Sequence, residues 1–430
     1  MSLLNMKKII IKLLHSLTRS VLKKYKPTII AITGSVGKTA TKEAVFVVLS
    51  SKYRVRKNAK NYNTEIGLPL TILGTRPPAK SFYKWCRVFW RGLGLLLFKQ
   101  AYPEMLVLEM GAGRPGDIAE LVGIVKPKVG VITAIAATHT EQFGSVAGVA
   151  KEKGKLYRAI DKDGFMVVNQ DDKEVIKLAE AGKGKIVSCG ITTGDEVAVR
   201  GSEIAVSRSN ENLTGISGMS FKLITEGTVT PVLLRDVLGE HQVYPALAAA
   251  AVGQIFDIHS VDVAEALGKV IPQAGRMRLL PGIKHTLIID DTYNASPVSV
   301  AAALRAVAEL DGEAKKYVVL GDMLELGSLS ESEHQKAGKL VAKYKFDVLV
   351  AVGEKSRDIA RAAHAGGMSH DFIFEFEHAE EAGRFVQDRI EQGDVVLVKG
   401  SRAMAMEKIV KEIMAEPEKA SELLVPSSSH

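Results

Sequence analysis

A glycine-containing segment with the sequence TGSVGKTAT, at residues 33–41, has the composition of a phosphate-binding loop. The β-branched run at 27–33 predicts a strand before it, and the stretch at 38–50 predicts a helix after it. In this setting backbone N–H groups can hold phosphates, Lys38 can neutralise their charge, and the Thr39 hydroxyl can bind Mg²⁺. The residues expected to bind ATP or GTP are Gly34, Ser35, Val36, Gly37, Lys38 and Thr39.

The match to the general phosphate-loop pattern is incomplete, because Ile32 stands where that pattern has its first glycine. The alternative is a chance Gly-Lys-Thr in a strand-to-helix turn.

Two more side chains suited to phosphate chemistry follow predicted strands. Glu109 ends the apolar run at 105–109, and His139 follows the run at 129–134. Ligands of α/β folds lie at the carboxyl ends of the strands, so we expect both residues beside the loop. Together they predict a Mg²⁺ site, although Mg²⁺ usually prefers oxygen ligands. The alternative is a solvated loop carboxylate and a hydrogen-bonded histidine.

The elements that must position these residues alternate between strand and helix. This alternation predicts a parallel α/β sheet, with short antiparallel strands at its edge within 188–234 and a second, smaller α/β domain after Arg276. The strand candidates are 27–33, 105–109, 129–134 and 165–169, then 286–290, 317–320, 348–352, 372–376 and 395–399; the helix candidates include 146–159, 244–256 and 261–270.

The composition is that of a folded protein with two or three domains. The chain has 430 residues, of which 46% are hydrophobic and 25% charged. Two cysteines are too few for a disulfide framework or a four-cysteine zinc site, so a reducing cytosol is expected. No uncharged apolar run reaches the roughly 18 residues that a spanning helix needs.

Positive charge is concentrated at the N-terminal end. Residues 1–104 carry 20 Lys/Arg against three Asp/Glu, whereas the whole chain has a net charge of +8. This asymmetry implies an anionic partner, such as a nucleotide, an anionic lipid or a nucleic acid. The sequence contains no aromatic-interleaved RNA module and no zinc finger, so nucleic acid is not expected.

Two basic segments have an amphipathic pattern. In the leader at 1–26, apolar residues recur at three- and four-residue steps opposite lysines and arginines, and the stretch at 82–96 repeats the arrangement. Both predict helices that dock on anionic lipid at the inner face of the membrane. The alternative is that the two segments pack on each other or form a dimer interface.

Six blocks of the sequence resemble the Mur ligase family, and within it the MurF group. The blocks are NAKNYNTEIGLPLTIL (58–73), LEMGAGRPGDIAEL (108–121), ATHTEQFGSVAGVAKEKGKLY (137–157), DDTYNASP (290–297), GDMLELG (321–327) and KGSRAMAMEK (399–408). The resemblance implies a central P-loop ATPase domain at 27–276 and a Rossmann-like C-terminal domain at 277–420, between the basic leader at 1–26 and a frayed tail at 421–430. It also implies that the N-terminal domain with which MurF enzymes usually bind a UDP-sugar is lacking, because only 26 residues precede Pro27.

Roles for individual residues follow from this resemblance. Glu109 and His139 resemble the family's magnesium ligands, with Thr39, and Lys153 resembles a lysine that many Mur ligases carry as a carbamate ligand for a second Mg²⁺. The residues that resemble adenine, ribose and γ-phosphate contacts are His241, Gln242, Arg276, Asp291 and Asn294; those expected to bind substrate are Asn63, Thr64, Lys399, Ser401 and Arg402. The family usually has Asn at the positions of Gln242 and Thr64. For the loop at 399–402, the alternative is that its polar groups satisfy its own backbone.

The resemblance implies an ATP-dependent ligase that adds D-alanyl-D-alanine to a muramyl-peptide precursor through an acyl phosphate. Lys38, Glu109, His139, Lys153 and Arg276 are its expected catalytic residues. Alternatives are a polyglutamate or cyanophycin-type ligase, a ligase for a lipid-linked cell-wall precursor, or a nucleotide-dependent scaffold without catalysis.

Overall fold

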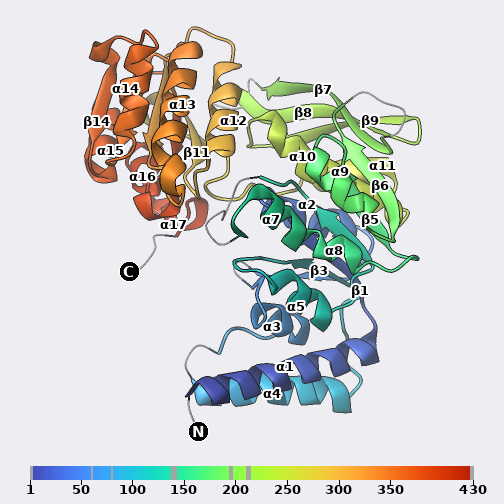
Figure 1. The fold of residues 1–430 in the computed structure, drawn as a ribbon. Coiled ribbons are helices and arrows are strands. Elements are labelled where there is room, and N and C mark those ends of the chain that lie inside the picture. The colour runs from blue at the N-terminus through green and yellow to red at the C-terminus, as the bar shows by residue number, and fades with distance from the viewer. Residues whose placement is uncertain are drawn as a thin grey trace. The chain divides into compact units, whose positions relative to one another are not determined.

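The computed structural model describes residues 3–59, 62–78, 81–136, 143–192, 197–209 and 215–426. The chain divides into two compact units (Figure 1). Unit 1 contains residues 1–202, 222–230 and 244–269, and unit 2 contains residues 203–221, 231–243 and 270–430. The domain boundary expected at 276 stays a prediction.

The first sheet has nine strands in the order β2-β3-β1-β4-β5-β6-β7-β8-β9. Pairing from β2 through β7 is parallel, as the alternation of strands and helices predicts. A two-residue turn with positive φ at Glu226 and Gly227 joins β8 to β9 as a hairpin. The strands are β1 (Thr28–Thr33), β2 (Val55–Lys57), β3 (Met105–Glu109), β4 (Val129–Ile132), β5 (Phe165–Asn169), β6 (Lys185–Gly190), β7 (Val199–Arg208), β8 (Ile216–Thr225) and β9 (Thr228–Arg235).

Alternate residues of a strand point to opposite faces of the sheet, and here both sets are apolar. Helices therefore cover both faces. Ile29 and Ala31 pack in one core with α3, α5, α8 and α9, whereas α2 packs on β1 and β3 and contacts α11. The helices are α2 (Lys38–Ser50), α3 (Gly67–Leu73), α5 (Asp117–Ile124), α7 (Val146–Lys153), α8 (Lys155–Arg158), α9 (Lys173–Glu180), α10 (Val243–Ile255) and α11 (Ser260–Leu267). The helix predicted at 146–159 is divided at Gly154 into α7 and α8.

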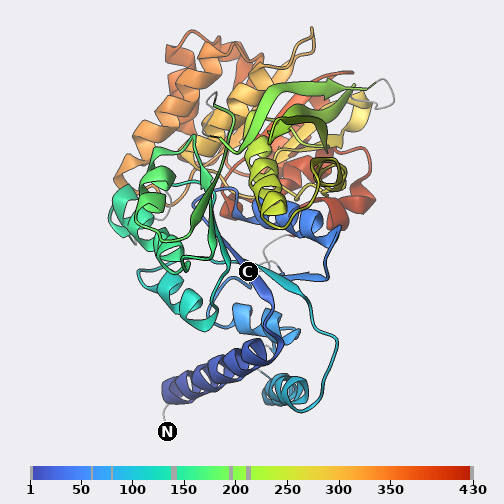
Figure 2. The same ribbon diagram turned by 90° about the vertical axis from the view of Figure 1, so that its right-hand side faces the viewer.

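Two further helices, α1 (Leu3–Tyr25) and α4 (Phe82–Leu97), lie side by side and contact α3 (Figures 1 and 2). Leu14 and Val21 of α1 share a buried cluster with Val88 and Leu95 of α4. The two predicted amphipathic segments are therefore helices that pack on each other. No helix in the described part of the chain is long and apolar enough to cross a membrane.

The sheet of unit 2 has six strands in the order β10-β11-β15-β12-β13-β14, of which only the β10-β11 pairing is antiparallel. Tyr317 and Val319 of β12 face a core with α15 and α16, while α12, α13 and α14 pack in succession. This is the Rossmann-like pattern expected for the C-terminal part. The strands are β10 (Arg278–Pro281), β11 (Leu287–Asp291), β12 (Lys316–Gly321), β13 (Val348–Val352), β14 (Ile373–Phe376) and β15 (Val395–Lys399); the helices are α12 (Pro297–Ala308), α13 (Ser330–Lys343), α14 (Arg357–Ala365), α15 (Ala379–Arg389), α16 (Glu407–Ile413) and α17 (Ala420–Leu423).

The C-terminal segment differs from the expected frayed tail over residues 421–426. Leu424 and Val425 are buried after α17, and the guanidinium of Arg402 donates a hydrogen bond to the carbonyl of Pro426. Apolar burial of its leucine and valine therefore holds this segment on unit 2. Residues 427–430 lie outside the described residues.

Candidate active site

The phosphate loop lies between β1 and α2, as the sequence predicts. Gly34 and Gly37 have φ values of 151° and 80°, a backbone conformation that favours glycine. The N-cap of α2 is Gly37, which has no side chain to cap the helix, and helix N-termini of this kind bind anions through their first N–H groups. The Lys38 amine donates to the carbonyl oxygens of Gly34 at 2.8 Å and Ser35 at 3.1 Å. A lysine held over the loop in this way is placed to meet a phosphate.

Gly34 also lies close to Thr133, the residue after β4, which makes it a sensitive position. A Cβ there would lie 1.9 Å from the Thr133 hydroxyl oxygen, with a positive φ in addition. Gly34→Ala is expected to weaken ATP binding by about tenfold or more, because strain of this kind costs about 1–3 kcal/mol. Calorimetric titration with ATP measures the change.

The matched control is Gly123→Ala in α5. An added Cβ there meets nothing within 4 Å. ATP affinity equal to that of the wild type in both variants would contradict the loop's role.

Glu109 lies at the end of β3, paired in register with Ile32 of β1, and so stands beside the loop. Its carboxylate is 3.3 Å from the amine of Lys42 and accepts a hydrogen bond from the Asn63 side chain at 3.2 Å. Lys42 is almost completely buried. The structure thus brings Glu109 and Asn63 together, whereas the Thr64 hydroxyl accepts from the Gly67 N–H at the start of α3.

Lys153 is the last residue of α7 and is buried, with 3% of its surface exposed. Burial, together with the positive charge of Lys38, lowers the pKa of the Lys153 amine to about 7 against the opposing effect of Glu152. A large fraction of this amine is therefore neutral near neutral pH. A neutral amine is the form that can react with CO₂.

Oxygen donors at the carboxyl edge of the sheet include the Glu109 carboxylate and the Thr39 hydroxyl, and such donors suit Mg²⁺. His139 lies outside the described residues, which contain no cluster of three His, Cys, Asp or Glu side chains that could hold a metal by themselves. The expected magnesium ligands stay predictions.

A second set of predicted site residues gathers in unit 2. The Gln242 side chain donates to the carbonyl of Arg276 at 3.3 Å, and the Arg276 guanidinium stacks on the Tyr293 ring at 4.2 Å. The Arg276 Nε is buried without a hydrogen-bond partner among the described residues. Burial, then the charges of Lys399 and Arg305, lower the pKa of His241 to about 4, so its imidazole is neutral at neutral pH.

Asp291 and Lys399 form a buried ion pair where β11 and β15 end side by side. The Lys399 amine donates to the Asp291 carboxylate at 2.6 Å and to the Asn294 carbonyl at 2.9 Å. Burial raises the pKa of Asp291, although Lys399 and Arg276 both oppose the shift. The pair fixes the segment that carries Asn294.

The other residues predicted to bind the amino substrate also have internal partners. The Ser401 hydroxyl accepts from the Leu324 N–H at 2.9 Å, and Arg402 donates two hydrogen bonds to Glu407. Both side chains therefore already have partners within unit 2, outside the backbone of the loop. Substrate binding by Lys399, Ser401 and Arg402 stays a prediction.

Lys42, Asn58 and Tyr293 were not predicted as site residues. Lys42 follows Lys38 by one helical turn, which is a usable signal for a second cation on the same face. The Asn58 side chain accepts from the Glu109 N–H at 2.9 Å and donates to its carbonyl at 3.0 Å, so it braces the end of β3. The only sequence signal that pointed to Tyr293 as a site residue is its position between Asp291 and Asn294.

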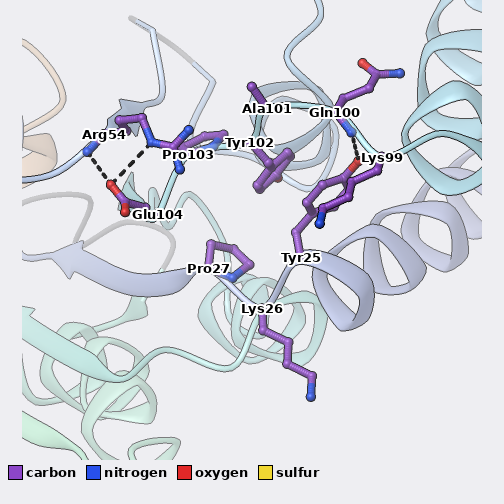
Figure 3. A pocket seen from close by; sticks show the side chains of 10 residues that line it. All are labelled: Tyr25, Lys26, Pro27, Arg54, Lys99, Gln100, Ala101, Tyr102, Pro103 and Glu104. Atoms are coloured by element: carbon purple, nitrogen blue, oxygen red, sulfur yellow. Dashed lines mark hydrogen bonds and ion pairs between the residues drawn. The ribbon is translucent and has the colours of Figure 1, made fainter.

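An open pocket of about 630 Å³ lies elsewhere, where α1 and α4 end (Figure 3). Tyr25 and Tyr102 stack on one another beside it at 4.4 Å, and Arg54 pairs with Glu104 at its rim. Pro27 and Glu104 precede β1 and β3, so this pocket lies at the amino ends of the strands. The phosphate loop lies at their carboxyl ends, so the pocket is not the nucleotide site.

Comparison with known proteins agrees with this geometry. The Mur ligase middle domain matches residues 92–253, and the family model described as "Mur ligase, glutamate ligase domain" matches residues 275–402. Over 407 residues the chain is 31% identical to the UDP-N-acetylmuramoyl-tripeptide--D-alanyl-D-alanine ligase of Bacillus subtilis, covering 94% of this chain and 79% of that protein. The chain belongs to the Mur ligase family.

Solved structures that are similar to the chain include those of MurF. Crystal structure I of MurF from Acinetobacter baumannii shares 30% identity at a TM-score of 0.74, covering 92% of this chain and 79% of that one. MurF from Thermotoga maritima, solved in complex with ADP, shares 26% identity at a TM-score of 0.75, covering 95% and 84%. The predicted resemblance to MurF is confirmed.

Proposed function

We propose that the chain is an ATP-dependent amide ligase that joins D-alanyl-D-alanine to a UDP-N-acetylmuramoyl tripeptide in peptidoglycan synthesis. The observation that carries the proposal is the phosphate loop with Glu109 and Lys153 beside it, in a chain whose relatives include the UDP-N-acetylmuramoyl-tripeptide--D-alanyl-D-alanine ligase. A carboxylate oxygen of the peptide attacks the γ-phosphorus of ATP. This forms an acyl phosphate and releases ADP.

The second half of the reaction forms the amide bond. The amine of D-alanyl-D-alanine attacks the acyl carbon, and inorganic phosphate leaves the tetrahedral intermediate with its electron pair while the nitrogen loses a proton. No protein nucleophile is needed. Catalysis rests on positioning and on the positive charge that Lys38 and Arg276 present to anionic oxygens.

Each residue set has a distinct part in this scheme. The loop from Gly34 to Thr39 binds the phosphates, while His241, Gln242, Asp291 and Asn294 contact the nucleoside, with Arg276 at the γ-phosphate. Thr39, Glu109, His139 and carbamylated Lys153 would hold two Mg²⁺ ions, which would supply positive charge against the carboxylate and the phosphate. Asn63, Thr64, Lys399, Ser401 and Arg402 orient the substrates.

Peripheral contact with the anionic inner face of the membrane belongs to the same proposal. It is supported by the 20 Lys/Arg against three Asp/Glu in residues 1–104. An anionic lipid surface attracts such a segment by about 1 kcal/mol per basic side chain.

Phosphate release from ATP tests the reaction. D-alanyl-D-alanine together with UDP-N-acetylmuramoyl tripeptide is expected to stimulate release, because the acyl phosphate needs the carboxylate and turnover needs the amine. Either substrate alone is the control, and mass spectrometry should find one amide product per phosphate. If glutamate or aspartate supports turnover and D-alanyl-D-alanine does not, a polyglutamate or cyanophycin-type reaction takes its place.

A further inference from the structure

Exposed apolar side chains are concentrated on the α1 and α4 helices. Of the fifteen large hydrophobic residues exposed in the described part of the chain, seven belong to these two helices and the residue after α4. Trp90, Leu97 and Phe98 have 73%, 72% and 66% of their surface exposed. The remaining four are Ile9, Leu13, Tyr83 and Leu93. Scattered apolar residues are ordinary, but a cluster of this size marks an interaction surface.

Packing of the two helices on each other does not account for this cluster. The inward face of α4 already has its partners, because Val88 and Leu95 are buried with α1 and α3, and Gly92 lies against the Leu17 side chain. Tyr83, Trp90 and Leu97 are spaced by seven residues and form a second apolar stripe on another side of the helix. That stripe has no cover in the described structure.

Hydrogen bonds join α1 and α4 into one platform. The Lys24 amine of α1 donates to the carbonyls of Leu95 at 2.9 Å, Leu96 at 2.8 Å and Phe98 at 3.1 Å, at the C-terminal end of α4, where the last carbonyls of a helix lack N–H partners within the helix. The Tyr25 hydroxyl donates to the Leu95 carbonyl as well. These bonds keep Leu97 and Phe98 outside the pair.

The platform is strongly cationic. The sequences of α1 and α4 together contain nine Lys/Arg and no Asp or Glu. Lys12, Arg19 and Lys23 of α1 and Lys84 and Arg87 of α4 are all exposed. An apolar stripe beside exposed cations is the arrangement with which helices lie in the headgroup region of a membrane.

We propose that the α1–α4 pair is a docking surface for an anionic lipid bilayer, with Trp90, Leu97 and Phe98 entering the interface and the lysines and arginines contacting headgroup phosphates. The assignment rests on the membrane contact proposed above and is independent of the ligase reaction. Because α1 leads into β1 and α4 into β3, the pair lies at the amino edge of the sheet. The docked protein therefore holds its phosphate loop at the edge of the sheet away from the bilayer.

Sedimentation with vesicles tests the proposal. The full chain is expected to sediment at low salt with vesicles of equal parts phosphatidylglycerol and phosphatidylcholine, and to remain in solution with phosphatidylcholine alone. The bound fraction should fall as salt is added, because screening weakens the attraction. Failure to sediment with the anionic vesicles at low salt would overturn the proposal.

Substitutions on the outer stripe identify the surface. The double variant Trp90→Ser/Leu97→Ser is expected to lower the partition coefficient at least about tenfold, since two apolar side chains no longer enter the interface. Phe372→Ser, at a similarly exposed aromatic residue of unit 2, is the matched control and should bind vesicles as the wild type does. Equal binding by wild type and the double variant would refute the assignment.

Two further readouts separate this surface from the other roles that it could have. Light scattering without lipid should give the same mass for wild type and double variant. A dimer that only the double variant loses, without vesicle binding by the wild type, would identify a second copy of the chain as the occupant. Substrate-stimulated phosphate release in lipid-free solution should be unchanged in the double variant. Loss of phosphate release would therefore count against the ligase proposal alone, and loss of vesicle binding against the docking proposal alone.

Discussion

Lys153→Ala is expected to lower amide formation by at least about 10²–10³-fold, the loss typical when a charge-stabilising group is removed from an active site. In the proposed carbamate, the lysine would react with CO₂ as the neutral amine, forming an N–C bond and releasing a proton, to give an anionic oxygen ligand. Because its pKa is lowered to about 7, the amine becomes protonated as the pH falls below that value. Turnover should therefore decrease below about pH 7 and in buffer depleted of CO₂, and bicarbonate should restore it.

Matched variants separate this role from folding. Lys151→Ala changes an exposed lysine of the same helix and should keep wild-type turnover. Lys153→Met keeps the buried aliphatic stem, so it should fold as the wild type does while losing activity. Acetate or formate is expected to restore part of the activity of Lys153→Ala by replacing the missing anion. Wild-type turnover in both Lys153 variants would eliminate the carbamate from the mechanism.

Lys399→Met is expected to reduce the free energy of unfolding of unit 2 by about 3–5 kcal/mol, because it leaves the Asp291 carboxylate buried without its cation. Burial already raises the pKa of Asp291, and removing Lys399 raises it further. At a pH above the unfolded-state pKa of an aspartate and below the raised folded-state pKa of Asp291, the folded protein keeps the proton and the unfolded chain does not. The free energy of unfolding therefore falls as the pH rises through this window. The deficit should be large at neutral pH and shrink as the pH approaches 4. Urea unfolding at several pH values measures it.

The control for this substitution is Lys408→Met. Lys408 pairs with Glu380 at the surface, and such pairs contribute about 1 kcal/mol or less. The double variant Asp291→Asn/Lys399→Met removes both charges and should recover part of the loss. If Lys399→Met has the same free energy of unfolding as the wild type, the ion pair does not stabilise the end of β11. The substrate-binding role predicted for Lys399 from the sequence would then be favoured.

Element types were well predicted where local pattern and burial agree. The runs at 105–109, 165–169, 348–352 and 395–399 are strands with those bounds, because strands buried on both faces read as unbroken apolar segments. β10 was missed because RLLP is short and contains an arginine and a proline. The break at Gly154 was missed because periodicity extends through it.

The sequence alone determined the fold class, the family and the residue types available for phosphate chemistry, since a phosphate loop needs its glycines and lysine in one local turn. Tertiary structure decided what those residues contact. Glu109 meets Lys42 and Asp291 meets Lys399 across 67 and 108 residues of chain, respectively. The neutral tendency of Lys153 arises from burial and from Lys38 on another helix, and the uncovered stripe of α4 is defined only once its opposite face is packed. Burial and charge environment depend on segments distant in sequence, and local spacing does not encode them.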